Sequence, residues 1–162
     1  ALVEAQNKKF YLEKYKPVID AKIAYFNKLR ETCVTTKSGL QFTIVKKGNG
    51  KKPVAGADIY INYAGFLEDG TLFDTSLENV ATNFGKFDQQ RANANQYVPI
   101  PFQAGKKDGM IPGFIEGIEN ISFGDKAVLF IPARLGYGEA GAGNVIPSNA
   151  NIIFEIELLE KK

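Results

Sequence analysis

The chain contains no histidine and no tryptophan, and it has one cysteine and one methionine. Without histidine, a Ser–His–Asp triad, a histidine metal ligand and acid–base catalysis by histidine are all excluded. A single cysteine, Cys33, cannot form an internal disulfide. No apolar run reaches the length of about 18 residues that a membrane-spanning helix needs. The sequence therefore excludes enzymes that depend on histidine, and it offers no candidate for a membrane-spanning helix.

An excess of one charge is also missing. Twenty Lys and Arg residues face eighteen Asp and Glu residues, so the formal net charge is only +2. This balance gives no strong attraction to nucleic acid or to an anionic membrane. A length of 162 residues with 44% hydrophobic residues fits one domain plus an appendage. Because the chain begins with Ala1, we expect a processed or trimmed form, in which an upstream signal peptide or lipid anchor would not be visible.

Glycine is absent before Gly39, although the chain has sixteen glycines. This break divides the sequence into an arm, residues 1–36, and a body, residues 37–162. Apolar residues of the arm recur at helical spacing, so we expect an amphipathic helix there. Pro17 is expected to end one helix or to begin a second one. Three interpretations of the arm stay open: packing on its own domain, a dimerisation or spacer arm, and a helix on a membrane surface.

The body is expected to be rich in strands. Apolar and polar residues alternate in most of its hydrophobic segments, which favours an antiparallel sheet with one solvated face. The expected strands are residues 39–48, 57–66, 126–133 and 151–160. One short helix is expected near residues 111–120, with Pro112 in its first turn and Phe114 and Ile118 on its inner face. The predicted fold class is α+β, a twisted antiparallel sheet with one helix across it.

Residues 77–98 interrupt this pattern, since they do not alternate and are rich in Asn, Gln and Ala. We expect a loop or a partly helical insertion, and loops of this length are often functional. A second irregular segment contains Gly136-x-Gly138-x-x-Gly141, the spacing of a dinucleotide-binding loop. That function needs a helix after the last glycine, but Pro147 and a strand pattern follow instead. We therefore expect no nucleotide there, and Tyr137, between two glycines, has a hydroxyl free to point at a ligand.

Three motifs in fixed order resemble the FKBP-type peptidyl-prolyl cis–trans isomerases. They are YINYAGFLEDGTLFDTS at residues 60–76, MIPGFIEGIENISFGDKAVLFIPARLGYG at 110–138, and VIPSNANIIFEIELL at 145–159. The resemblance spans residues 48–159 and implies a twisted antiparallel sheet wrapped around one short helix. The helical arm resembles that of bacterial members of the family. The family's activity is isomerisation of X–Pro peptide bonds, and it implies no cofactor and no metal.

The resemblance also implies the site residues, carried over position by position. Catalytic roles are implied for Tyr63, Phe73, Asp74, Ile111, Phe114, Tyr137 and Phe154, and substrate-binding roles for Ile100, Met110, Val145 and Ile146. Among these, the Ile111 backbone amide would bind a substrate carbonyl and the Tyr137 hydroxyl would donate to the substrate. Phe114 stands where the family often has tryptophan, and Ile100 is aliphatic where an aromatic is expected. The segment between Phe73 and Ile100 is longer than in minimal members.

The resemblance implies unfolded or partly folded polypeptides with X–Pro bonds as substrates, macrolides as inhibitors, and no nucleic acid. The arm suggests a homodimer and a place in the periplasm or cell envelope, with a lipoprotein as one form of it and the cytoplasm as the alternative. The competing interpretation of the whole chain is a weakly catalytic or non-catalytic chaperone or peptide-binding module. The arm, the insertion and Ile100 favour this second interpretation.

Overall fold

A computed structural model describes residues 2–161, so the outer ends of the two predicted domains, residues 1 and 162, lie outside it. Helix α1 (Leu2–Arg30) is a single helix of 29 residues with Pro17 inside it. The prediction that Pro17 separates two helices was wrong. Proline inside a helix costs about 3 kcal/mol, because a hydrogen bond is lost and the ring clashes with the preceding turn. Contacts on both sides of Pro17 offset this cost: the Tyr11 hydroxyl donates to the Phe84 carbonyl at 2.5 Å, and Ile19 is buried.

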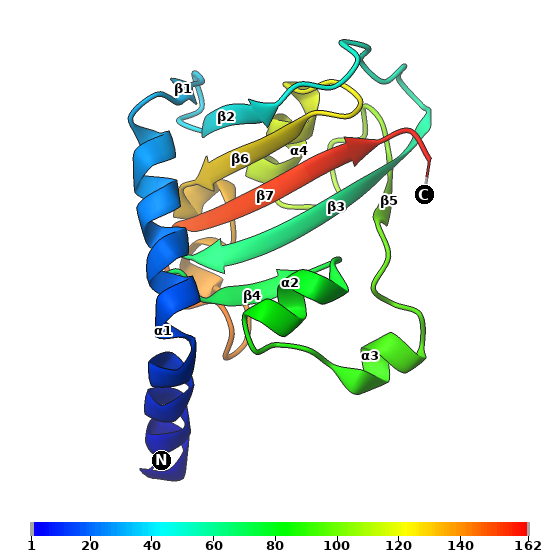
Figure 1. The fold of residues 1–162 in the computed structure, drawn as a ribbon. Coiled ribbons are helices and arrows are strands. Elements are labelled where there is room, and N and C mark those ends of the chain that lie inside the picture. Colours follow the sequence, from blue (N-terminus) through cyan, green and yellow to red (C-terminus); the bar gives the residue numbers. More distant parts are fainter. Residues whose placement is uncertain (1, 162) are drawn as a thin grey trace.

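The strands form one antiparallel sheet, which confirms the predicted fold class (Figure 1). They are β1 (Val34–Thr35), β2 (Gln41–Lys46), β3 (Asp58–Leu67), β4 (Leu72–Thr75), β5 (Ile100–Gln103), β6 (Lys126–Ile131) and β7 (Ile152–Leu159). Their order is β1-β2-β6-β7-β3-β4, and β5 pairs with β3 beside β4. The four longest strands coincide with the four predicted segments, and only β3 extends past its segment, by one residue.

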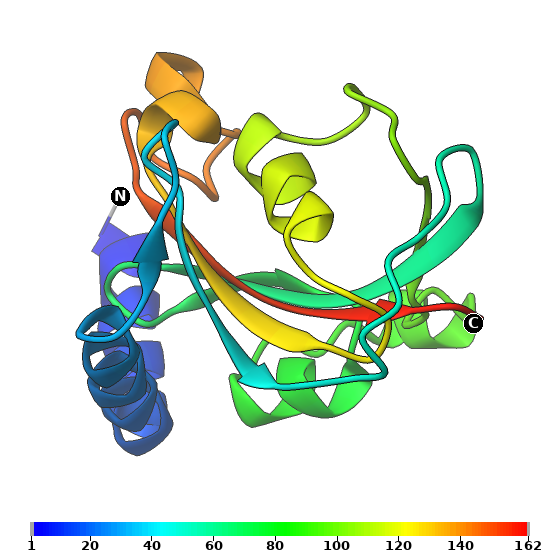
Figure 2. The ribbon, with the colours of Figure 1, turned by 90° about the horizontal axis from the view of Figure 1, so that it is seen from above.

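Helix α4 (Pro112–Glu119) lies across one face of the curved sheet (Figure 2). Pro112 occupies its first turn, and Phe114 and Ile118 are both buried, as their spacing predicted. They join inward-facing residues of β3, β6 and β7 in the larger of two hydrophobic clusters. The face of the sheet under α4 is therefore the principal core, and the helix N-terminus is held above it at a fixed place.

The other face of the sheet is covered at one end, so the expectation of one solvated face was partly wrong. Ile19 and Phe26 of α1 are buried there against Phe66, Phe130 and Ile153. The Phe26 ring makes edge contacts with Phe66 at 5.3 Å and with Phe130 at 6.2 Å between centroids. The continuous apolar sequence of β6 reflects burial on both of its faces.

The first turns of α1 differ from the rest of the helix in their contacts. Figure 1 shows these turns extending beyond the sheet, and Val3 and Phe10 are 68% and 71% exposed. Packing of the arm on its own domain, one of the three interpretations, therefore holds for the helix from Tyr11 onward. The boundary predicted at residue 36 falls just after β1, which pairs with β2. None of the described helices is long and apolar enough to cross a membrane.

The insertion is partly helical, with α2 (Glu78–Asn83) and α3 (Gln89–Asn93). Its first part packs on α1: Phe84 is buried, and Gly85 has a positive φ of 70° beside the Tyr15 ring. A side chain at Gly85 would come within 2.4 Å of that ring. After β6, two short 3₁₀ helices follow, η1 (Ala133–Leu135) and η2 (Gly138–Ala140). No α-helix follows Gly141 before β7 in the described chain, so the glycine motif lacks the helix that a dinucleotide loop needs.

Candidate functional site

A small cavity of about 190 Å³ opens between α4, the sheet and the segment after β6. Nine of the eleven predicted site residues line it, together with Gly109. The nine are Tyr63, Phe73, Asp74, Ile100, Met110, Ile111, Phe114, Tyr137 and Phe154. They come from β3, β4, β5, the start of α4, η2 and β7. Residues up to 91 positions apart in sequence are thus gathered around one apolar space.

Phe154 of β7 lies at the centre of the aromatic part of the cavity. Its ring meets Phe114 at 5.0 Å and Phe73 at 5.5 Å between centroids, with interplanar angles of 87° and 84°. Such edge-to-face pairs are favourable beyond their buried area. The close packing requires Gly65 on β3, since a Cβ there would lie 2.5 Å from the Phe73 ring. The rings of Phe73 and Phe114 are therefore each held nearly at right angles to the ring of Phe154.

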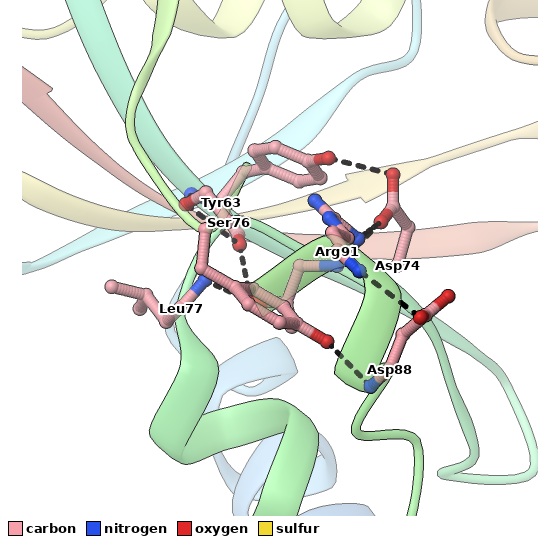
Figure 3. A network of polar contacts seen from close by, with 8 residues as sticks. Tyr63, Asp74, Ser76, Leu77, Asp88 and Arg91 are labelled. Atoms are coloured by element: carbon pink, nitrogen blue, oxygen red, sulfur yellow. Dashed lines mark hydrogen bonds and ion pairs between the residues drawn. The ribbon is translucent and has the colours of Figure 1, made fainter. Parts of the chain in front are cut away.

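The polar part of the cavity is organised around the Asp74 carboxylate (Figure 3). One carboxylate oxygen accepts a hydrogen bond from the Tyr63 hydroxyl at 2.6 Å, and the other accepts one from the Arg91 guanidinium at 2.9 Å. The Thr75 backbone N–H also donates to the second oxygen at 2.8 Å. Burial, and then the bond to Asp74, raises the pKa of Tyr63. Its hydroxyl therefore stays protonated at neutral pH and cannot act as a base.

Arg91 was missed by the sequence reasoning. It lies on α3 of the insertion, seventeen positions beyond Asp74, and its own N–H is capped by the Asp88 side chain at 3.1 Å. The available signal was weak: Arg91 is one of two basic residues in a segment of otherwise Asn, Gln and Ala character, the other being Lys86. The ion pair between Arg91 and Asp74 therefore holds the insertion against the cavity.

Two hydrogen-bond donors at the cavity have no acceptor among the described residues. One is the Tyr137 hydroxyl, whose pKa is raised by burial and then by the negative charge of Asp74. The other is the backbone N–H of Ile111, the residue that caps the N-terminus of α4. The partial positive charge of a helix N-terminus adds to the attraction for an acceptor at this place. A ligand carbonyl would find two unused donors here.

Val145 and Ile146 do not line the cavity, contrary to the expectation. Val145 is 53% exposed at the tip of a loop, and Ile146 is buried in the main core. The reason is local, because Ala142 and Ile146 pair as an isolated bridge and exchange backbone hydrogen bonds of 2.9 and 3.0 Å. This closed turn directs Ile146 inward and leaves Val145 outside.

Comparison with known proteins agrees with the residues that line the cavity. The family model described as FKBP-type peptidyl-prolyl cis-trans isomerase matches residues 49–159. FkpA of Aeromonas hydrophila is 37% identical over 133 residues, which are 82% of this chain and 42% of that protein. An FK506-binding protein of Neisseria meningitidis is 38% identical over 122 residues, 75% of this chain and 95% of that protein.

Solved structures agree in fold. The crystal structure of FkpA from Escherichia coli matches with a TM-score of 0.60 and 31% identity, covering 98% of this chain and 67% of that one. AtFKBP13 matches with a TM-score of 0.62 and 30% identity, covering 81% of this chain and 98% of that one. The chain spans less than half the length of FkpA from A. hydrophila. The family match covers most of the body and all nine residues of the cavity, so this chain belongs to the FKBP-type peptidyl-prolyl cis-trans isomerase family.

Proposed function

We propose that the chain catalyses cis–trans isomerisation of X–Pro peptide bonds in unfolded or partly folded polypeptides. The observation that carries the proposal is the pairing of an aromatic cavity with two unused donors, the Tyr137 hydroxyl and the Ile111 N–H. Nothing in this reaction requires a nucleophile, a general base or a metal, since no covalent bond breaks. A chain without histidine is well suited to such chemistry.

The barrier of about 18–20 kcal/mol arises because rotation removes the amide resonance. The planar amide carries more charge on its oxygen than the twisted amide does, so a dry apolar cavity favours the twisted form. Catalysis requires this preference for the transition state over both planar forms. A 10⁵-fold acceleration corresponds to about 7 kcal/mol. Aromatic contacts and hydrogen bonds of about 1 kcal/mol each supply part of this, and desolvation of the amide supplies the rest.

We assign roles to the cavity residues on this basis. The rings of Phe73, Phe114 and Phe154 enclose the proline, and Ile100 and Met110 form the rim. The Ile111 N–H binds a substrate carbonyl, and the Tyr137 hydroxyl donates to a second one. Asp74 holds the Tyr63 ring in position by accepting a hydrogen bond from its hydroxyl. Its carboxylate also places a negative charge near the nitrogen of the twisted X–Pro amide. Residues 37–162 carry this activity, and residues 1–36 serve as the arm.

The Tyr137→Phe variant tests the assignment of the hydroxyl. It removes one donor and keeps the ring, so kcat/KM for a short X–Pro peptide should fall about five- to tenfold, the effect of one hydrogen bond to the transition state. A protease-coupled assay on a peptide with leucine or phenylalanine before proline measures this. Turnover by the wild type is the test of the proposed function itself, and a well-folded but inactive wild type would refute it. Unchanged activity in the variant would refute only the role of the hydroxyl.

A second role, holding unfolded chains as a dimeric chaperone, is favoured by the exposed first turns of α1. Val3 and Phe10 are 68% and 71% exposed, and their spacing of seven residues places them on one side of the helix. We propose that a second copy covers this surface. Light scattering should then give about twice the chain mass of 17.8 kDa, and Phe10→Glu should return the mass to that of one chain. A wild type that stays monomeric at high concentration would contradict the dimer.

Location and inhibition complete the proposal. The helical arm and the similarity to bacterial FkpA proteins support a place in the periplasm or cell envelope, with a lipoprotein anchor as one form of it and the cytoplasm as the alternative. The aromatic walls of the cavity would accept the macrolide inhibitors of the family.

A further inference from the structure

Two aromatic residues of the insertion, Phe87 and Tyr97, form a pair outside the cavity. Their rings are nearly parallel, with an interplanar angle of 14° and a centroid distance of 6.0 Å. The Tyr97 ring is held firmly, since its hydroxyl accepts a hydrogen bond from the Asp88 N–H at 3.0 Å and the Arg91 guanidinium lies 4.7 Å from its centre. Phe87 remains 40% exposed. Rigid and accessible aromatic rings are typical of contact sites for other proteins.

The aromatic pair is continuous with the cavity. The same guanidinium that lies over Tyr97 donates to Asp74, which lines the cavity. The insertion also leaves the sheet after β4, just beyond Asp74, and returns at Ile100 of β5, another lining residue. Figure 3 shows Arg91 between Asp74 and Asp88, at the junction of the two regions. A chain leaving the cavity past Asp74 would therefore meet the insertion.

We propose that Phe87 and Tyr97 form a second subsite for the polypeptide whose X–Pro bond occupies the cavity, and that it takes an aromatic or large apolar side chain. This inference rests on the function proposed for the cavity. The neighbouring guanidinium is paired with a carboxylate, so the subsite offers ring surface rather than net charge. An apolar side chain gains free energy by leaving water for such a surface.

The geometry sets the position of that side chain in the substrate. The Asp74 carboxylate accepts a hydrogen bond from the Arg91 guanidinium at 2.9 Å, and the guanidinium centre lies 4.7 Å from the centre of the Tyr97 ring. An extended chain covers about 3.3–3.6 Å per residue, so it would pass from Asp74 to Tyr97 in about two to three residues. Because the proline lies on the cavity side of Asp74, the preferred side chain should lie about three residues from the proline. A peptide of four residues is too short to reach the subsite, whereas one extended by four residues on each side can reach it.

The test compares matched pairs of extended peptides that carry phenylalanine or alanine three residues before, or three residues after, the proline. For the wild type, kcat/KM should be about fivefold higher with phenylalanine on one of the two sides, as expected for one well-packed aromatic contact. In Phe87→Ser this preference should fall close to one. Phe87→Tyr, which keeps the ring, and Val54→Ser, which alters an apolar residue 76% exposed elsewhere, should keep the wild-type preference.

Equal rates for the phenylalanine and alanine peptides in the wild type would overturn the subsite. So would a preference that survives Phe87→Ser, or a change in oligomeric state in that variant, which would assign the pair to a contact between copies. Isomerisation of the short peptide separates this inference from the proposed function. If the wild type turns over the short peptide but shows no preference among the long ones, only the subsite fails.

Discussion

Replacement of Phe154 by alanine is expected to reduce kcat/KM for a short X–Pro peptide by about 100-fold, the largest loss at any single position. Phe154 lines the cavity, so its removal takes away ring surface that would contact the substrate proline, and it frees the rings of Phe73, Phe114 and Tyr63 that pack on it. A 100-fold loss corresponds to about 2.7 kcal/mol of transition-state stabilisation. Removal of the ring also opens the cavity to water, which would restore solvation of the planar amide. The protease-coupled assay measures the loss directly.

The same substitution should lower the free energy of unfolding by about 3–5 kcal/mol, because a buried phenylalanine is removed. Ile156→Ala is the matched control: Ile156 lies two residues along the same strand, is buried in the same core and does not line the cavity. It should lose stability of a similar order while the folded protein keeps its activity. If both variants lose activity in proportion to their stability, the aromatic wall has no specific role.

Phe26→Ala is expected to lower the free energy of unfolding by about 3–5 kcal/mol, although the residue lies in the arm and far from the cavity. Phe26 is 2% exposed and packs on Phe66 and Phe130 across the second face of the sheet. The folded variant should keep its rate of isomerisation. Urea denaturation followed by circular dichroism gives the stability, and assays well below the midpoint give the rate.

Tyr25→Ala is the control for this prediction, since Tyr25 is the adjacent residue of the same helix and is 38% exposed. It alters helix propensity in nearly the same way as Phe26→Ala, and we expect it to lower the free energy of unfolding by at most about 1 kcal/mol. If the two variants lose the same small amount of unfolding free energy, the second half of α1 is not part of the folding unit. The arm would then be a detachable element, as the division at residue 36 assumes.

Much of the sheet could be predicted, because the alternation in residues 39–48, 57–66 and 151–160 reflects burial under α4. The second hydrophobic cluster, between α1 and the other face of the sheet, could not be predicted. Val128 and Phe130 look like part of an ordinary buried strand, and no local pattern shows that a helix more than 95 residues earlier covers them. The continuity of α1 through Pro17 escaped prediction for the same reason, since the contacts that offset the proline come from residues of the insertion and of the sheet.

The candidate site was accessible mainly through the resemblance to a family. Composition alone allowed an apolar aromatic pocket but could not assemble Tyr63, Asp74 and Tyr137, which come from three separate segments. Arg91 could not be predicted, because it lies within an insertion without periodicity, seventeen positions from its partner Asp74. Val145 and Ile146 were assigned by position in a motif, and a local backbone bridge decides where they point.

The packing of α1 on the second face of the sheet affects the order in which the molecule folds during synthesis. Ile19 and Phe26 leave the ribosome well before Ile153, which lies 127 positions beyond Phe26. The ion pair of 2.9 Å between Lys22 and Glu155 closes a loop of 133 positions. Contacts this distant in sequence form late, so the apolar side of the nascent helix is not fully covered until β7 has been made. A chain that we propose to assist the folding of others would thus itself expose an unprotected hydrophobic surface during its own synthesis.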